Sequence, residues 1–265
     1  MQAGRRGATT PAVRFGPLTR RGLCRGALAA AAVPRLAQAR AQADSVLFIG
    51  DSMVGGAFGL FLERRLAAAG LSVHREGRPS TGLSRPDFFD WQARAEKLVA
   101  KVRPDLCLVM FGGNDAQGIA LRRRGPRGRR VFIRWHEPAW TPTYAARVAR
   151  LADTLQGGGA RLGWIGMPVM GRGRLGERMI RINRIVRAEM AIRKDARFLD
   201  IWPVLADARG RYAARLPIGP GGRRVRVRAG DDVHLTVAGA RYLAAHVEPR
   251  VLALAPRAAS AAGAP

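Results

Sequence analysis

The sequence predicts an α/β protein of the doubly wound, flavodoxin-like class, a three-layer sandwich around a central, mainly parallel, five-stranded sheet. From residue 45 onward, short apolar runs alternate with longer segments in which apolar residues recur at helical spacing. The apolar runs are continuous, which is typical of strands buried on both faces. Because 265 residues with 48% hydrophobic content can bury one such core, we expect one domain.

The elements are expected in strict alternation along the chain. Strands are expected at 45–49, 71–74, 105–111, 161–167 and 197–201. Helices are expected at 57–69, 88–102, 143–155, 179–192 and 237–254. The first helix is followed by Gly70, a residue type that is common just beyond helix ends. This order predicts a parallel sheet with helices on both faces.

The formal charge of +27 is spread along the whole chain. Only three of the 46 lysines and arginines are lysines, and the arginines accompany abundant Ala, Gly and Pro, as is typical of a GC-rich genome. No basic stripe with interleaved aromatic residues occurs, so we expect no specific nucleic-acid partner. The densest arginine run, within 121–131, interrupts both periodicities and predicts a loop or excursion with solvated charges. The alternative for this segment is attraction of an anionic polymer.

The first 43 residues have the features of an export signal. Paired arginines within 19–25 precede a short apolar stretch at 26–33, and Ala-x-Ala sites follow at 37–39 and 41–43. This pattern predicts a twin-arginine-type signal peptide, residues 1–43, and a periplasmic or secreted protein with no membrane span after cleavage. The alternative is a disordered leader without function.

After removal of such a leader, Cys107 is the one remaining cysteine. It lies inside a continuous apolar run, which indicates a small buried side chain and not a reactive thiol. We therefore expect no intramolecular disulfide in the mature chain.

Polar residues follow the carboxyl ends of predicted strands, where doubly wound proteins bind their ligands. Ser52 lies in a Gly-Asp-Ser motif after the first strand, and Asn114 lies in Gly-Gly-Asn-Asp after the third. An Asp-Asp-Val-His motif, 231–234, precedes the last helix. Acyl transfer needs these groups: a hydroxyl, a base, a carboxylate to orient the base, and donors for the developing oxyanion. Taken alone, Ser52 could equally be a helix cap.

In this order the motifs resemble the four sequence blocks of the SGNH, or GDSL, hydrolase superfamily. The blocks are 48–52, 80–84, 112–115 and 231–234. Two segments, 82–91 and 113–117, are most similar to the periplasmic branch of that superfamily. The resemblance covers a domain at 44–256 and leaves 257–265 as an expected disordered tail.

The resemblance implies a role for each of five residues. Ser52 would be the nucleophile, with His234 as its base and Asp231 as the orienting carboxylate. The Gly82 amide and the Asn114 side chain, together with the backbone amide of the serine, would form the oxyanion hole. The short spacing in the last block lets one loop hold both Asp231 and His234. No metal or other cofactor is implied.

The function expected from these motifs is an extracytoplasmic serine esterase that hydrolyses carboxyl esters, with O-acetyl groups on cell-envelope carbohydrate as the substrate. One alternative is a carbohydrate O-acetyltransferase that uses the same acyl-enzyme on Ser52. Another is a non-catalytic glycan-binding or nucleic-acid-binding protein. The chain lacks the Gly-x-Ser-x-Gly elbow, the phosphate-binding loop and the His-Glu-x-x-His motif, so it offers no support for their chemistries. Its oligomeric state is left open.

Overall fold

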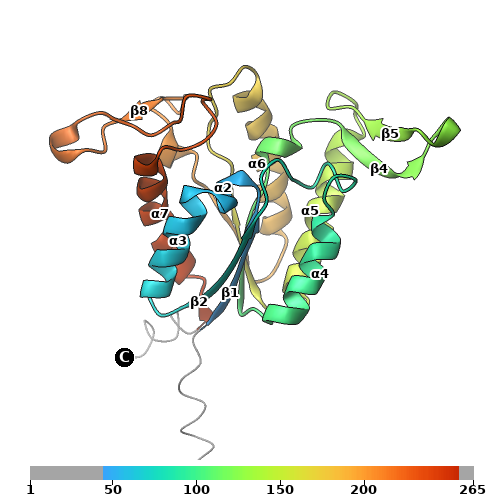
Figure 1. Cartoon of the computed structure of the whole chain (residues 1–265), viewed down its shortest axis with the longest axis horizontal. Coiled ribbons are helices and arrows are strands. Elements are labelled where there is room, and N and C mark those ends of the chain that lie inside the picture. The colour runs from blue at the N-terminus through green and yellow to red at the C-terminus, as the bar shows by residue number, and fades with distance from the viewer. Residues whose placement is uncertain (1–43, 257–265) are drawn as a thin grey trace, which may run out of the picture. The chain divides into compact units, whose positions relative to one another are not determined.

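The computed structural model describes residues 44–256, and its centre is one parallel β-sheet. The five strands are β1 (Ser45–Gly50), β2 (Ser72–Gly77), β3 (Leu106–Met110), β6 (Arg161–Ile165) and β7 (Ala196–Leu199). Their spatial order is β2-β1-β3-β6-β7, and every neighbouring pair is parallel (Figure 1). This is the flavodoxin-like order, so the predicted fold class is confirmed.

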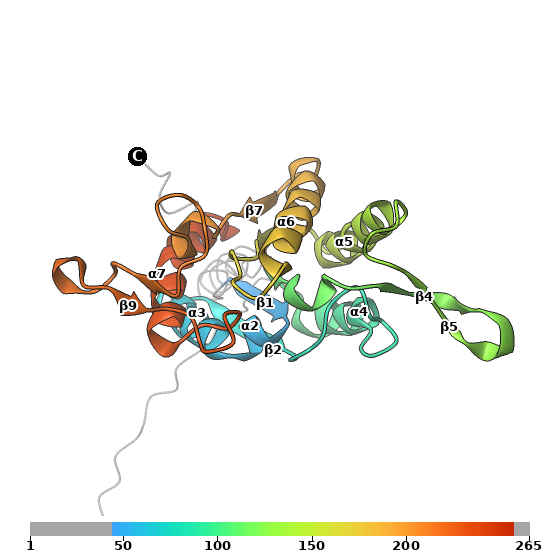
Figure 2. The same ribbon diagram turned by 90° about the horizontal axis from the view of Figure 1, so that it is seen from above.

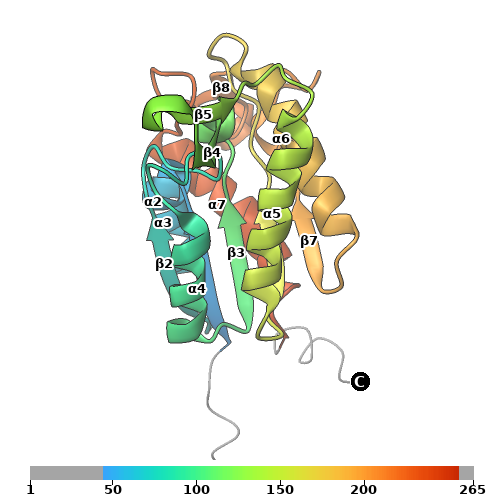
Figure 3. The same ribbon diagram turned by 90° about the vertical axis from the view of Figure 1, so that its right-hand side faces the viewer.

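Helices cover both faces of the sheet. They are α2 (Ser52–Gly55), α3 (Ala57–Ala68), α4 (Trp91–Val102), α5 (Trp140–Gln156), α6 (Leu175–Ala191) and α7 (Val237–Leu252). Helices α3 and α7 pack together on one face, and α4, α5 and α6 lie along the other (Figures 1 and 3). The result is the expected three-layer arrangement.

The core follows from the continuous apolar runs of the central strands. All five residues of β3 are buried, and in β1 only the first residue is partly exposed. Burying a large apolar side chain stabilises the fold by about 1.5–3 kcal/mol. On the face of α4 and α5, the ring of Phe111 lies between Trp91 and Trp164, at centroid distances of 5.0 and 6.5 Å. Cys107 is fully buried in β3, and burial raises the pKa of its thiol to about 12, as expected of a structural side chain.

Three helix starts differ from the expected ones, and the largest difference is in α6, which begins at Leu175 and not at 179. Helix α5 begins at Trp140 and not at 143, because Pro142 falls in the first turn, where its missing N–H is not needed. Helix α4 begins at Trp91 and not at 88, because the Asp90 carboxylate caps it by accepting the Ala93 N–H at 3.2 Å.

The arginine-rich segment, predicted as a loop or excursion, is an excursion from the main sheet with regular structure and not a loop. It forms an antiparallel hairpin of β4 (Ile119–Arg124) and β5 (Arg130–Ile133), joined by a short 3-10 turn, η2 (Pro126–Gly128). The hairpin lies outside the main sheet, and only its base at Ile119 and Ala120 is buried, whereas the arginines at 122–124 are exposed. The arginine-rich part of the sequence therefore carried no strand periodicity to detect.

A second hairpin, β8 (Arg215–Leu216) with β9 (Val225–Arg226), was not expected at all. Its strands are two residues long, which is too short for any period to show. The two hairpins extend on opposite sides of the described domain, at the end where β1 leads into α2 (Figures 1 and 2).

The predicted signal peptide, 1–43, and the predicted tail, 257–265, lie outside the described residues. Between residues 44 and 256, no helix is long and apolar enough to cross a membrane. In that same range, no three His, Cys, Asp or Glu side chains gather in a way that could hold a metal ion.

Candidate active site

Ser52 lies at the junction of β1 and α2, and each residue of its motif has a structural reason. Gly50 ends β1 with no room for a side chain, since a Cβ there would clash with Val54 and with the Met110 carbonyl of β3. The Asp51 carboxylate caps α2 by accepting the Met53 N–H at 2.9 Å. Because Asp51 is the cap, the Ser52 hydroxyl is free for another partner.

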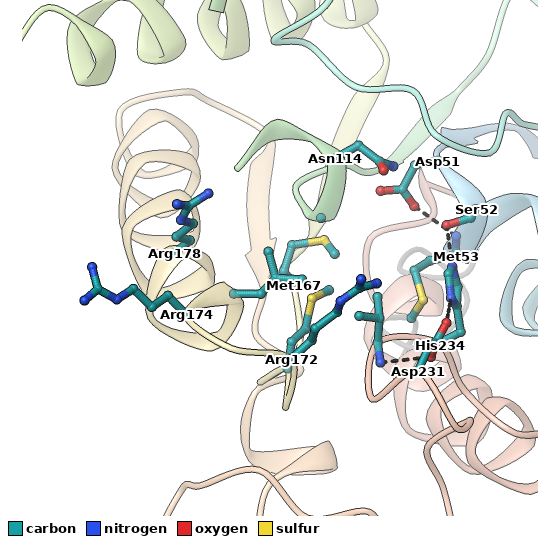
Figure 4. Close-up of a pocket in the computed structure, with 14 residues that line it drawn as sticks. Asp51, Ser52, Met53, Asn114, Met167, Arg172, Arg174, Arg178, Asp231 and His234 are labelled. Carbon is teal, nitrogen blue, oxygen red and sulfur yellow. Dashed lines mark hydrogen bonds and ion pairs between the residues drawn. The ribbon is translucent and has the colours of Figure 1, made fainter. Parts of the chain in front are cut away.

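That partner is His234. Ser52 Oγ lies 2.8 Å from His234 Nε2, and His234 Nδ1 lies 2.5 Å from Asp231 Oδ2 (Figure 4). The other carboxylate oxygen of Asp231 accepts the backbone N–H groups of Val233 and His234, at 3.0 and 2.9 Å. The hydrogen bond from His234, followed by these backbone bonds, holds the pKa of Asp231 well below its usual range. An ionised Asp231 keeps the proton on Nδ1, so that Nε2 can accept the proton of Ser52.

The adjacent carboxylate, Asp232, points to a different partner. Tyr212 donates its hydroxyl to Asp232 Oδ1 at 2.5 Å, and the Asp232 carbonyl accepts the Gly171 N–H at 3.1 Å. The left-handed backbone of Asp232, with φ of 59°, turns the chain so that the two neighbouring carboxylates diverge. The loop is closed by a hydrogen bond from Ala229 N–H to the His234 carbonyl, at 2.8 Å.

A buried arginine supports the loop that holds Asp231 and His234. Arg228 is fully buried and donates to the carbonyls of Val233 and Val169. It therefore ties the segment after β6 to the residue that precedes His234. Burial lowers the pKa of Arg228 to about 10, and the group still carries its charge at neutral pH. Sequence reasoning missed it, because nothing distinguishes one arginine from another in so arginine-rich a chain.

We expect Arg228→Met to destabilise the fold and to impair the site. Methionine fills a similar volume but leaves the carbonyls of Val169 and Val233 without donors, at a cost of about 3 kcal/mol. Urea unfolding measures the change in the free energy of unfolding, and the reactivity of the Ser52 hydroxyl measures the effect on the loop. The matched control is Arg224→Met, since Arg224 is exposed in the second hairpin. Equal effects of the two substitutions would contradict a special role for Arg228.

Asp115 holds the second and third sequence blocks, 80–84 and 112–115, together through hydrogen bonds. Its buried carboxylate accepts the Ser84 N–H at 2.7 Å and the Tyr144 hydroxyl at 2.9 Å, and its carbonyl accepts the Ser84 hydroxyl at 3.0 Å. Gly82 packs directly against this carboxylate, and a Cβ at that position would clash with it. Asp115 was part of the recognised motif, but its role in fixing the two blocks could not be read from local sequence.

Two buried carboxyl groups next to the site have raised pKa values. Burial raises the pKa of Asp51 to about 7 and that of Asp115 to about 6, against the hydrogen bonds that each accepts. The folded protein therefore holds protons that the unfolded chain, with an ordinary pKa of 3.8, has released. These groups make the free energy of unfolding fall as pH rises from about 4 to about 7.

Asp51→Asn removes one of these titrations, and we expect its effect to depend on pH. The free energy of unfolding of the variant, relative to wild type, should rise between about pH 4 and pH 7, by at most about 1.4 kcal/mol per pH unit, and then level off. Urea unfolding at several pH values measures this difference. Asp153→Asn removes an exposed carboxylate as a control. If the difference in the free energy of unfolding between Asp51→Asn and wild type stays constant with pH, the raised pKa of Asp51 is contradicted.

The predicted oxyanion donors are only partly assembled. Asn114 lines the cavity beside Ser52, and its side chain donates one N–H to the Thr81 carbonyl at 3.1 Å, which leaves a second N–H available. Gly82 is buried next to Asp115 and is not among the residues that line the cavity. The structure thus brings four of the five predicted residues to one cavity, and the donor role of Gly82 stays a prediction.

The cavity has a volume of about 570 Å³. Its 14 lining residues come from the start of α2, the 3-10 turn η1 (Gly113–Asp115), the segment between β6 and α6, the start of α6, and the 231–234 loop (Figure 4). It therefore lies beyond the carboxyl ends of β1, β3 and β6. In a doubly wound sheet this is where ligands bind, beside the point at which the strand order reverses.

Solved structures share this fold. An acetylxylan esterase from Geobacillus stearothermophilus, solved as a catalytic mutant, is 19% identical with a TM-score of 0.55, covering 78% of this chain and 94% of that one. An α/β hydrolase from the Lake Arreo metagenome is 16% identical with a TM-score of 0.53, over 81% and 96%. A GDSL-like lipase from Bacteroides thetaiotaomicron is 13% identical with a TM-score of 0.50, over 78% and 86%.

These structures have the same fold as this chain, and the ordered sequence blocks resemble those of the SGNH, or GDSL, hydrolase superfamily. Residues 45–250 match the family described as "Protein of unknown function (DUF459)", and the chain belongs to that family. No curated protein matches the sequence.

Proposed function

We propose that the protein is a serine esterase that hydrolyses carboxyl esters through an acyl-enzyme on Ser52. One observation carries this proposal: a continuous chain of hydrogen bonds runs from Ser52 Oγ through His234 to Asp231, and all three residues line one cavity. A serine that merely capped a helix would need neither the imidazole nor the carboxylate.

The geometry supports the following first step. Ser52 Oγ attacks the ester carbonyl carbon while His234 Nε2 takes its proton. The ionised Asp231 stabilises the resulting imidazolium, since its carboxylate already accepts the Nδ1–H. The carbonyl oxygen becomes an oxyanion, and we propose that it is bound by the free N–H of Asn114 and the backbone N–H groups of Ser52 and Gly82.

The second step releases the alcohol and regenerates the enzyme. His234 returns its proton to the leaving alcohol oxygen, and water then attacks the acyl-enzyme by the same route. The side chain of His234 is 45% exposed, so water can reach the acyl group. This exposure favours hydrolysis over transfer to a sugar hydroxyl, which would require that water be kept out.

We further propose that the enzyme acts outside the cytoplasm on O-acetyl groups of carbohydrate. The twin-arginine pattern within residues 1–43 supports export. The name of the acetylxylan esterase that shares the fold describes an acetylated glycan as the substrate of that protein, and this supports the same class here. If export occurs, the N-terminal sequence of the exported protein should begin near residue 40 or 44.

Hydrolysis of p-nitrophenyl acetate by the protein tests the esterase proposal. We expect p-nitrophenol to be released much faster than in buffer alone. A serine nucleophile that is hydrogen-bonded to its base accelerates acyl transfer by several orders of magnitude. A rate no higher than that of buffer, from correctly folded protein, would contradict the proposal.

Mass spectrometry of an acetylated oligosaccharide tests substrate and acceptor together. Hydrolysis removes acetyl groups and releases acetate, whereas a transferase moves them onto an added, unacetylated acceptor. We expect free acetate and no acetylated acceptor. Acetylated acceptor as the main product would replace the esterase with the O-acetyltransferase.

A further inference from the structure

Three arginines line the same cavity as Ser52 and His234. Arg172 and Arg174 lie between β6 and α6, and Arg178 lies at the start of α6. Such a concentration of positive charge beside a reactive serine bears on the kind of ester that the cavity accepts.

The cavity lining offers these arginines no free counter-charge. Among residues 44–256, the carboxylates that line the cavity are Asp51 and Asp231. Asp51 is buried, and its carboxylate caps α2. Asp231 is held by His234 and the backbone of its own loop. The positive charges are therefore open to a ligand.

The three arginines differ in how far they are already engaged. Arg178 donates to the Ala116 carbonyl at 2.6 Å and lies over the Trp135 ring, 5.2 Å from its centroid. Arg172 and Arg174 are exposed, and within residues 44–256 their side chains make no hydrogen bond or ion pair. The side chain of Arg172 extends toward Met53 and His234, whereas Arg174 and Arg178 point away from them (Figure 4). Arg172 is thus the free cation that faces the reacting groups.

The position of Arg172 indicates which part of an ester it meets. His234 must protonate the leaving oxygen, so the alcohol part of the substrate lies on the His234 side of Ser52. Asn114, the expected oxyanion donor, lies on the other side of Ser52 in Figure 4. Arg172 extends toward the His234 side, and so it faces the alcohol and not the acyl group.

We propose that Arg172 is a specificity-determining residue that binds an anionic group, a carboxylate or a phosphate, on the alcohol part of the ester. This inference rests on the proposed esterase function. A guanidinium binds either anion through two parallel N–H donors, a geometry that lysine does not reproduce. The same lining includes the apolar side chains of Met53, Met167 and Met170, so the cavity offers both a cation and apolar surface to a ligand.

Matched acetyl esters test the proposal. The first is 4-acetoxybenzoate, which carries a carboxylate on the alcohol part, and the second is its neutral methyl ester. A third, 4-acetoxyphenyl phosphate, distinguishes phosphate from carboxylate. For each enzyme variant, the quantity measured is the ratio of kcat/KM for the anionic ester to kcat/KM for the neutral one. Comparing this ratio between a variant and wild type cancels the chemical difference between the leaving groups.

Arg172→Gln should lower this ratio about tenfold for the anion that the site prefers, in line with the loss of one charge-assisted contact. Arg172→Lys should lower it by less. Arg64→Gln removes an exposed charge on α3 that is not among the residues lining the cavity, and it should leave the ratio unchanged. Added salt should reduce the ratio in wild type more than in Arg172→Gln.

The outcomes separate this inference from the function on which it rests. If both kinds of ester are cleaved in a Ser52-dependent way but Arg172→Gln leaves both ratios as in wild type, the specificity proposal is wrong and the esterase stands. If Arg64→Gln lowers the ratio as much as Arg172→Gln, the effect is one of total charge and the proposal is also wrong. If wild type cleaves none of the three esters, both proposals fail.

Discussion

Replacing Ser52 with alanine is expected to lower kcat for ester hydrolysis by about 10⁴- to 10⁶-fold, because no other group in the cavity is placed to form the acyl-enzyme. The fold should be unaffected, since Asp51 caps α2 and the serine hydroxyl is hydrogen-bonded to His234 and not to the helix backbone. Initial rates with p-nitrophenyl acetate measure the loss of activity. The free energy of unfolding, measured by thermal unfolding, should stay within about 0.5 kcal/mol of the wild-type value.

The double variant Ser52→Ala, His234→Ala sharpens this prediction. If the two residues act as one unit, removing His234 after Ser52 costs nothing more, and the double variant should be as slow as the single one. Independent losses that multiply would contradict the coupling implied by the 2.8 Å hydrogen bond between them.

Asp231→Asn is expected to lower kcat by about 10⁴-fold. The asparagine amide can present an N–H to His234 Nδ1, which then becomes an acceptor and moves the ring proton to Nε2. A protonated Nε2 cannot take the proton of Ser52, so the nucleophile stays inactive although the geometry persists. Steady-state rates measure the loss, and circular dichroism checks the fold.

Asp232→Asn is the matched control for that substitution. Asp232 accepts a hydrogen bond from Tyr212, which an asparagine oxygen can also accept, whereas the imidazole of His234 is hydrogen-bonded to Ser52 and Asp231. We expect the activity of this variant to stay within about tenfold of wild type. A large loss in Asp232→Asn, together with an active Asp231→Asn, would move the orienting role to the neighbouring carboxylate.

The fold was predictable because the pattern of apolar residues that marks each strand and helix is local in the sequence. Continuous apolar runs such as 45–49 and 105–111 mark strands buried on both faces, and the structure places both at the centre of the sheet. The hairpins were not predictable, because arginine side chains in solvent impose no period and strands of two residues are too short to show one.

The residues brought to the cavity were predictable for a related reason. Ser52, Asn114 and the pair Asp231 and His234 each lie in a short motif at the end of a predicted element, where a doubly wound sheet gathers its loops. Their geometry in the structure agrees with the roles that we propose for them.

The supporting contacts could not be predicted. The role of Asp115 depends on Ser84 and Tyr144, which lie about 30 residues away on either side. Arg228 is recognisable only by its burial. Arg172 is recognisable only by its position in the cavity lining. Each of these facts belongs to the packing of distant segments, which no local pattern records.

Labelling with a fluorophosphonate tests the central claim most directly, because the reagent forms a covalent adduct only with a serine whose hydroxyl is activated. Mass spectrometry of the digested protein should locate one adduct, on Ser52, and His234→Ala should abolish it. Failure of the folded wild-type protein to react, or an adduct on another serine that persists in Ser52→Ala, would contradict the account.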